Sequence, residues 1–292
     1  MIRLEGVRKR FGRATVLDGI DLRIARGDRV ALVGSNGAGK TTLIRCLLGE
    51  YLHEGRITIQ GLEPRAHRTE VLKRVGFVPQ SSPPLKMPVG RLIAFAAGVS
   101  DADPAGMKAV AARLGLDVGA LAHQPFNRLS GGMKQKLLIS IALGRECDLL
   151  VLDEPAANLD PEARHAFFAL LAERQETAAM LISSHRLDEV AALVNRVIEL
   201  DQGRVVLDDH VADQVDIDSR LAAEVVLTRT EAAFARTIQG WGFVSDDGLH
   251  WRGQVAGPDR LRFLGVLSRY AALLDAVRFE VIPPASTRET AT

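Results

Sequence analysis

Short apolar runs alternate with amphipathic stretches through the first two thirds of the chain. Three of the runs are continuous enough to be buried strands, and they span Arg29–Gly34, Asp148–Asp153 and Ala178–Ser183. The first run leads directly into a helical pattern at Thr41–Leu48. Buried strands separated by helices are typical of a mainly parallel α/β core.

Two further parts are predicted beside this core: an antiparallel β layer and a helical subdomain. Ile2–Val7 and Leu17–Ile24 have the pattern of strands, and we expect them to form a separate antiparallel β layer. The stretch Val89–Ala122 is rich in Ala and Leu and is predicted to be helical. Because it lies between two parts of the core, we interpret it as an inserted helical subdomain over about residues 89–145.

The order of elements changes after an acidic segment, Asp208–Asp218. We therefore place the end of the first domain at residue 213, a linker at 214–220, and a flexible tail at 283–292. We expect a chain ending near Asp213 to fold. Between linker and tail the patterns predict βαββαβ, a small α+β domain of the ferredoxin-like type at 221–282. Its elements are expected at Leu221–Arg229 (strand), Glu231–Gly240 (helix), Gly242–Ser245 and Leu249–Val255 (strands flanking an Asp246–Gly248 turn), Asp259–Leu274 (helix) and Ala276–Ile282 (strand).

Composition narrows the class of protein. Hydrophobic residues make up 47% and charged residues 25%, as in ordinary globular proteins, which excludes a disordered or fibrous chain. The formal net charge is +1, and the C-terminal part balances its acidic residues with Arg, so we expect no nucleic-acid partner. No apolar stretch is long enough to span a membrane, and no signal peptide is evident. The two cysteines, Cys46 and Cys147, are expected to be reduced thiols in the cytosol.

A glycine-rich loop follows the first predicted strand. Gly34–Thr41 fits G-x-x-x-x-G-K-[ST] and opens a predicted helix, which is the context that this phosphate-binding motif requires. Its backbone N–H groups and the helix N-terminus would surround phosphates, with Lys40 on the β- and γ-phosphates and Thr41 on Mg²⁺. The loop predicts a nucleoside triphosphate but does not separate kinase, GTPase and ATPase.

Two carboxylates end the second buried run. Asp153 and Glu154 lie where the ligand-binding edge of a parallel sheet is expected. Asp153 is suited to the shell of Mg²⁺, and Glu154 to accepting a proton from an attacking water. A further motif, Leu129–Met133, places a serine and two glycines at the start of a helix, which makes a second anion-binding corner.

With these motifs the chain resembles the ATP-binding cassette (ABC) family over about residues 2–212. Gln80, Asn158–Asp160 and His185 resemble the family's Q-loop, D-loop and switch histidine. The resemblance implies a P-loop NTPase cassette that hydrolyses ATP with Mg²⁺. It implies catalytic roles for Lys40, Gln80, Glu154 and His185, metal ligation by Thr41, Gln80 and Asp153, and ATP binding by Phe11, Val16, Gly34, Ser35, Asn36, Gly37, Ala38, Gly39, Lys40, Thr41, Thr42, Ser130, Gly131, Gly132 and Asp160.

The family resemblance also implies a head-to-tail dimer, with a second copy or a homologous subunit. Ser130 and Gly132 of one subunit would close over the phosphate held by Gly34–Thr41 of the other. Two residues depart from the family pattern: Phe11 replaces the usual tyrosine that stacks on adenine, and Ala156 replaces a usual Thr or Ser. Phe11 can still stack on adenine, although it has no hydroxyl.

The interpretation that follows is the ATPase subunit of a transporter whose membrane-spanning subunits are separate chains. A soluble ABC ATPase in a cytosolic assembly process is the alternative, and a nucleotide-binding module without turnover is a third. Residues 132–137 and the small second domain resemble ABC-2 type export-associated ATPases. We therefore expect an exporter subunit on the cytoplasmic face of the cell membrane, with Ser81–Pro88 near the docking site of the membrane subunits. Regulation or dimer support is the role expected for the second domain.

Overall fold

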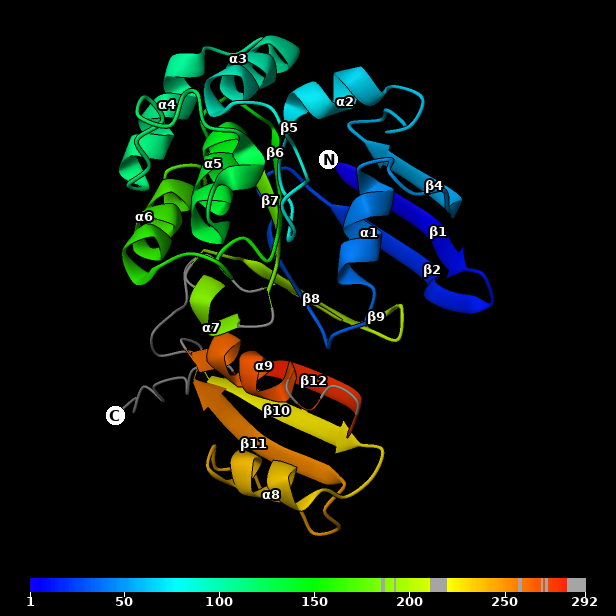
Figure 1. Ribbon diagram of the computed structural model, residues 1–292. Helices are drawn as coiled ribbons and strands as arrows, with labels where there is room; N and C mark the ends of the chain where they lie inside the picture. The colour runs from blue at the N-terminus through cyan, green and yellow to red at the C-terminus, as the bar shows by residue number, and fades with distance from the viewer. Residues whose placement is uncertain are drawn as a thin grey trace, which may run out of the picture. The chain divides into compact units, whose positions relative to one another are not determined.

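The computed structural model describes residues 1–184, 187–191, 193–210, 220–256, 259–268, 270 and 273–282. The chain forms two compact units (Figure 1). The first consists of Met1–His185 and Ala192–Asp208, and the second of Arg186–Ala191 and Asp209–Thr292. Among the described residues, no helix combines the length and apolar character that crossing a bilayer requires.

A six-stranded sheet with the order β5-β6-β7-β3-β8-β9 is the centre of the first unit. Neighbours among the first five strands of this order run parallel, which confirms the predicted parallel α/β core. Strands β6 and β7 are buried along their whole length, as expected of strands covered on both faces. The strands span Arg29–Val33 (β3), Val75–Val78 (β5), Leu149–Asp153 (β6), Ala179–Ser183 (β7), Arg196–Asp201 (β8) and Arg204–His210 (β9).

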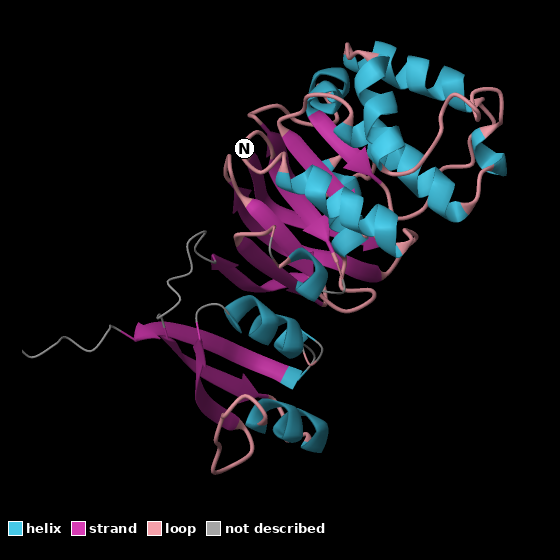
Figure 2. Cartoon of the chain, turned by 90° about the vertical axis from the view of Figure 1, so that its left-hand side faces the viewer, coloured by secondary structure: helices cyan, strands magenta, loops and turns pink. Residues whose placement is uncertain are grey.

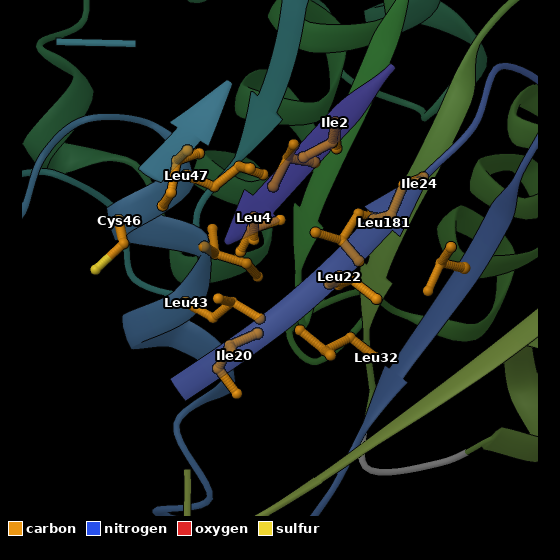
Figure 3. Close-up of a cluster of buried hydrophobic side chains, with 14 of the residues drawn as sticks. Ile2, Leu4, Ile20, Leu22, Ile24, Leu32, Leu43, Cys46, Leu47 and Leu181 are labelled. Atoms are coloured by element: carbon orange, nitrogen blue, oxygen red, sulfur yellow. The ribbon is translucent and has the colours of Figure 1, made fainter. Parts of the chain in front are cut away.

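The antiparallel layer forms as predicted, from β1 (Ile2–Phe11), β2 (Ala14–Ile24) and β4 (Glu54–Ile59) in the order β2-β1-β4. Helix α1 (Lys40–Leu47) shares one hydrophobic core with this layer and with one face of the central sheet. Figure 3 shows this core, where Leu43 and Leu47 lie near side chains of the antiparallel strands. The helix that begins at the glycine-rich loop is therefore held by two sheets.

A helical subdomain is inserted between β5 and β6. Figure 2 shows a cluster of helices at one end of the first unit. It has its own core, in which Phe126 is fully buried. The helical prediction for Val89–Ala122 is wrong in its last part, because the chain leaves the helix at Gly115, which has a left-handed φ of 71°. The helices of the first unit beyond α1 are α2 (Arg68–Arg74), α3 (Val89–Ser100), α4 (Pro104–Arg113), the 3₁₀ turn η1 (Phe126–Arg128), α5 (Gly131–Leu143) and α6 (Pro161–Ala172).

The second unit has a three-stranded antiparallel sheet with the order β11-β10-β12. Phe234 of α8 and Phe263 of α9 pack on the apolar face of β10 and β11. The predicted strand at Gly242–Ser245 is reduced to one bridge between Val244 and Arg252. The strand order is that of a ferredoxin-like sheet with this edge strand shortened. The elements are β10 (Arg220–Leu227), α8 (Ala232–Gln239), β11 (His250–Ala256), α9 (Arg260–Ser268) and β12 (Leu274–Ile282).

Three sequence-based boundaries need correction. Helix α9 ends at Ser268 rather than Leu274, because Leu274 already pairs with Leu227 in the sheet. Arg220, placed in the linker, is the first residue of β10. The units divide after Asp208 rather than 213. Residues 214–219 of the expected linker and the expected tail at 283–292 lie outside the described residues.

Helix α7 (Leu187–Val190) belongs to the second unit although its sequence lies within the first domain that we predicted. Leu187 and Val190 are buried, and α7 packs on α9. At Gly265 of α9 an added Cβ would lie 3.4 Å from the Cβ of Leu187, so the two helices are in close contact. The second unit therefore includes a segment that follows strand β7 almost directly.

Candidate functional site

The carboxyl ends of four parallel strands bring the sequence motifs to one edge of the central sheet. Strand β3 ends beside Gly34, and β6 ends at Asp153, which pairs with Ser183 at the end of β7. Strand β5 ends at Val78, two residues before Gln80. Ligands of open α/β sheets bind at this edge. The fold therefore collects motifs that are separated by more than a hundred residues in sequence.

The glycine-rich loop joins β3 to α1, as predicted. Gly34, Gly37 and Gly39 all have positive φ values, of 142°, 87° and 109°, which side chains rarely adopt. A Cβ at Gly34 would lie 2.2 Å from the Leu200 carbonyl oxygen, and one at Gly39 would lie 2.9 Å from the Val16 carbonyl oxygen. Conformation therefore favours glycine at all three positions, and space also requires it at Gly34 and Gly39. Ser35, Asn36 and Gly37 are exposed, Ala38 is buried, and Thr41 and Thr42 are half-buried at the start of α1.

Lys40 is the first residue of α1 and is 7% exposed. Its Nζ donates to the carbonyl oxygens of Gly34 and Ser35, at 2.7 and 3.2 Å, so the side chain folds back along the loop. Burial lowers the pKa of Lys40, and the carboxylates of Glu154 and Asp153 partly oppose this shift. The ammonium group is thus already desolvated and close to both carboxylates.

Asp153 and Glu154 are held in position by the same residue of the neighbouring strand. The hydroxyl of Ser183, itself fully buried, donates to Asp153 Oδ1 at 2.6 Å. The backbone N–H of Glu154 donates to Ser183 Oγ at 3.0 Å and to the Ser183 carbonyl oxygen at 3.2 Å. Glu154 has a φ of 48°, a left-handed conformation that a glutamate rarely adopts. A strained residue at a sheet edge is typical of functional sites.

Gln80 follows a strand at the same edge, and the sequence predicts the same for His185. Gln80 is exposed and lies beyond β5, whose last residue, Val78, pairs with Leu152. His185 lies outside the described residues, so its predicted position at the end of β7 stays a prediction. Ser184, directly before it, is buried, and its N–H donates to the Leu32 carbonyl oxygen at 3.2 Å.

The predicted second anion-binding corner lies at the start of helix α5. Ser130 is the N-cap of this helix, and its Oγ accepts from the Met133 N–H at 3.2 Å. Ser130 and Gly131 are exposed, and Gly132 is half-buried. A helix start with exposed small residues presents its N–H groups to solvent or to a ligand.

Asp160 is engaged within the chain. It is the N-cap of α6, where its Oδ1 accepts from the Ala163 N–H at 2.8 Å, and its Oδ2 pairs with Lys136 Nζ at 2.8 Å. The hydrogen bond from Lys136 is the main cause that lowers the pKa of Asp160. Both carboxylate oxygens therefore have structural partners, and the predicted contact of Asp160 with ATP stays a prediction.

The residues expected at the nucleobase lie on the antiparallel layer. Val16 approaches the glycine-rich loop through its carbonyl oxygen near Gly39. Phe11 is 45% exposed, and its ring meets Tyr51 edge-on with centroids 5.3 Å apart. Lys9 Nζ lies 4.6 Å from the centroid of Phe11, and Arg45 of α1 donates to the Tyr51 hydroxyl at 2.9 Å. An exposed ring braced in this way offers a face for stacking.

Sequence reasoning missed Ser183, Gln135 and Tyr51. Each is a polar or aromatic residue whose role depends on a contact across the fold, and none belongs to a phosphate-binding pattern. A serine at the end of the apolar run Ala179–Ser183 was the one visible signal, because a buried hydroxyl needs a partner.

The donors at this edge suit Mg²⁺ held together with phosphate oxygens. Asp153 supplies a carboxylate that is 2% exposed, and Thr41 supplies a hydroxyl at the start of α1. Mg²⁺ is commonly bound by one or two carboxylates together with substrate phosphates. Within the described part of the chain, no group of three or more His, Cys, Asp and Glu side chains could hold a metal. A Mg²⁺ site made of one carboxylate, one hydroxyl and phosphate oxygens does not require such a group.

Comparison with known proteins identifies the family. The ABC transporter family profile matches residues 17–157. The linearmycin resistance ATP-binding protein LnrL of Bacillus subtilis (strain 168) is 29% identical over 266 residues, which cover 86% of this chain and 82% of LnrL. The aliphatic sulfonates import ATP-binding protein SsuB 1 of Nocardia farcinica (strain IFM 10152) is 36% identical over 213 residues, 72% of this chain and 82% of the relative.

The fold is shared with solved structures as well. The ATP-binding subunit of an ABC transporter matches with a TM-score of 0.65 and 25% identity, over 73% of this chain and 91% of that subunit. This share corresponds in size to the first unit, which carries the glycine-rich loop, the Asp153–Glu154 pair and the Ser130 corner. The chain belongs to the ABC transporter family, whose ATPase domain binds and hydrolyses ATP.

Proposed function

We propose that this chain hydrolyses ATP to drive export through membrane-spanning subunits that are separate chains. The observation that carries the proposal is the arrangement at the sheet edge. Ser183 holds both Asp153 and Glu154 beside the glycine-rich loop, where burial has already desolvated Lys40. Such an arrangement can bind a triphosphate and place a carboxylate next to it.

In the proposed reaction Glu154 accepts a proton from the water that attacks the γ-phosphate. Lys40 and the loop N–H groups of Gly34–Thr41 meet the negative charge of the phosphates. Thr41, Asp153 and Gln80 would hold Mg²⁺, which when bound adds positive charge at the phosphate oxygens. His185 would order the γ-phosphate from the end of β7.

We infer that the working form is a dimer with a second copy or a homologous subunit. Ser130 is the N-cap of an exposed helix start. The loop that carries Lys40, Gly34–Thr41, lies far from it in the sequence. One chain thus carries two phosphate-binding corners. A head-to-tail dimer would combine the Ser130 corner of one subunit with the Gly34–Thr41 loop of the other.

The membrane subunits would dock next to Gln80, near Ser81–Pro88. Exposed apolar side chains on this part of the chain support a docking surface: Met87 precedes α3, and Phe95 and Val99 lie one turn apart on α3. Exposed large apolar residues close together are typical of interaction sites. This docking would hold the chain at the cytoplasmic face of the membrane.

Export is supported by the similarity to the resistance protein LnrL. The match to that resistance protein covers 266 residues, which requires sequence beyond the first unit. The similarity to LnrL therefore extends into the second unit, and the name of this resistance protein fits removal of a compound from the cell.

ATP hydrolysis is tested with Glu154→Gln. This variant should bind ATP and form a dimer in its presence, while kcat falls about 10²–10⁴-fold, as expected for the loss of a general base. Glu176→Gln at an exposed position is the matched control and should keep the activity of the unaltered chain. Near-normal hydrolysis by Glu154→Gln, together with a monomer in ATP, would contradict the proposal.

Direction of transport is tested with the membrane subunits that co-purify with the chain. In inside-out vesicles that contain the complex, an exporter takes up its substrate when ATP is added outside. Uptake only by right-side-out vesicles with ATP inside would show import.

A further inference from the structure

Gln135 is a fully buried amide on helix α5, with 1% of its surface exposed. Its Nε2 donates to the Pro155 carbonyl oxygen at 2.9 Å. An amide in the interior of a subdomain loses its hydration, and the hydrogen bond to Pro155 compensates for this loss. The bond joins residues twenty positions apart and connects α5 to the segment that follows β6.

The carbonyl that Gln135 binds lies next to Glu154. On the other side, the Glu154 N–H is held by Ser183 of β7. The segment is thus anchored on both sides of the residue whose φ is 48°. Because the ring of Pro155 fixes its own φ, an anchor on its carbonyl leaves few rotations through which Glu154 could relax.

Two more contacts join the first turns of α5 to residues 155–160. Lys136 pairs with Asp160 at 2.8 Å, with Lys136 only 15% exposed. Gly132 faces the Asn158 carbonyl oxygen so closely that an added Cβ would lie 3.1 Å from it. The start of α5 and the segment after Glu154 therefore pack closely together over several residues.

The geometry points to Gln135 as a positioning residue that holds Glu154 through Pro155 and couples it to the Ser130 corner. This inference rests on the proposed function, in which Ser130 contacts the nucleotide of the other subunit. Helix α5 carries Ser130 at its N-cap and Gln135 in its second turn. When the other subunit's nucleotide binds at Ser130 and displaces α5, the hydrogen bond from Gln135 to Pro155 is displaced as well. That bond anchors Glu154, which belongs to this chain's own ATP site. Each site of the dimer would then respond to occupancy of the other.

The experiment compares steady-state ATPase kinetics of the full chain with those of Gln135→Met, which keeps the size but removes the donor. We expect kcat to fall about tenfold, the equivalent of one lost hydrogen bond, with KM within about twofold. The matched control is Gln124→Met in the same subdomain, which removes an amide that donates to the Arg128 carbonyl at 3.3 Å on the surface. Equal kcat values for Gln135→Met and Gln124→Met would overturn the inference.

Gln135→Glu adds a readout that a merely structural defect would not change. When ionised, the new carboxylate has no proton to donate to the Pro155 carbonyl, but when protonated it restores the donor. Turnover of this variant, relative to the unaltered chain at each pH, should rise as pH falls, while the ratio for Gln135→Met stays flat. A flat ratio for both variants would reject the positioning role.

The coupling to Ser130 is tested by a double-mutant cycle with Ser130→Ala. If both residues act through α5, the double variant should lose little more turnover than the worse single variant. If the fold losses of turnover in the two single variants multiply in the double variant, the two residues act independently and the coupling is overturned. A chain that lacks ATPase activity before any substitution would contradict the proposed function instead, so the two failures are distinguishable.

Discussion

Glu199 lies on β8 in register with Val33, one residue before the glycine-rich loop. It is 3% exposed, and within the described part of the chain its Oε1 has no hydrogen-bond partner. Burial raises the pKa of this carboxyl from 4.5 to about 7, and the nearby Asp201 carboxylate adds to the shift. A buried carboxyl without a cationic partner prefers to be neutral.

The sign and size of the effect on stability follow from linkage. The folded state binds the proton more tightly than the unfolded state, so stability falls as pH rises from 4.5 to about 7 and then stays constant. The full cost above this window is about 3 kcal/mol, at about 1.4 kcal/mol for each tenfold difference in proton affinity. Between pH 5 and pH 8 the change amounts to about 2–3 kcal/mol.

Glu199→Gln replaces the carboxyl with a neutral group of the same size and should remove this pH dependence. Relative to the unaltered chain, the melting temperature of the first unit should rise about 5–10 °C more at pH 8 than at pH 5. Scanning calorimetry measures this transition. Both tryptophans, Trp241 and Trp251, lie in the second unit, so tryptophan fluorescence identifies the transition of that unit.

Glu176→Gln at an exposed position serves as the control for the loss of one carboxylate. It should shift the melting temperature by the same small amount at both pH values. A melting temperature of Glu199→Gln that follows that of the unaltered chain from pH 5 to pH 8 would refute the reasoning, because the buried carboxyl would then not titrate between these values.

Further predictions concern the site and the second unit. Ser130→Arg should abolish hydrolysis but leave ATP binding by the monomer intact. When this variant is mixed with Lys40→Ala, crosslinking should detect nucleotide-bound mixed dimers. The absence of such dimers would contradict a site shared between subunits. Phe11→Ala should raise the Kd for ATP about tenfold through the loss of stacking, measured by calorimetry, and an unchanged Kd would remove Phe11 from the site. The sequence pattern predicts that a chain ending near Asp213 folds, but a chain cut after Asp208 leaves Leu187 without α9, so we now expect it to aggregate in size-exclusion chromatography; Leu187→Ser should restore a soluble monomer. Equal behaviour with and without Leu187→Ser would show that α7 does not depend on α9.

Motifs that act through the backbone were predictable from the sequence. The positive φ values of Gly34, Gly37 and Gly39 follow from residue type, because only glycine adopts them at little cost. The parallel core was predictable too, since β6 and β7 are apolar throughout and read as strands buried on both faces.

Contacts across the fold were not predictable in the same way. The neighbours of β7 are β6 and β3, so Ser183 meets Asp153 only once the strand order is set. Gln135 lies two residues after the Leu129–Met133 motif, yet a lone glutamine on a helix does not indicate which carbonyl it binds. The place of α7 in the second unit depends on packing against α9, which lies about seventy residues further along the chain. The pattern of hydrophobic and polar residues along one segment does not indicate which distant segment it contacts.

The Ser183 hydroxyl explains why this position needs a serine rather than another small residue. A hydroxyl has one proton to donate and two lone pairs to accept with. The proton goes to Asp153 Oδ1, and a lone pair accepts from the Glu154 N–H. Alanine would remove the donor to Asp153 Oδ1 and leave the Glu154 N–H only its bond to the backbone carbonyl of residue 183, and a larger side chain would not fit in a position that is fully buried. The positions of Asp153 at the end of β6 and of Glu154 directly after it therefore depend on β7, the strand that His185 and α7 follow in sequence.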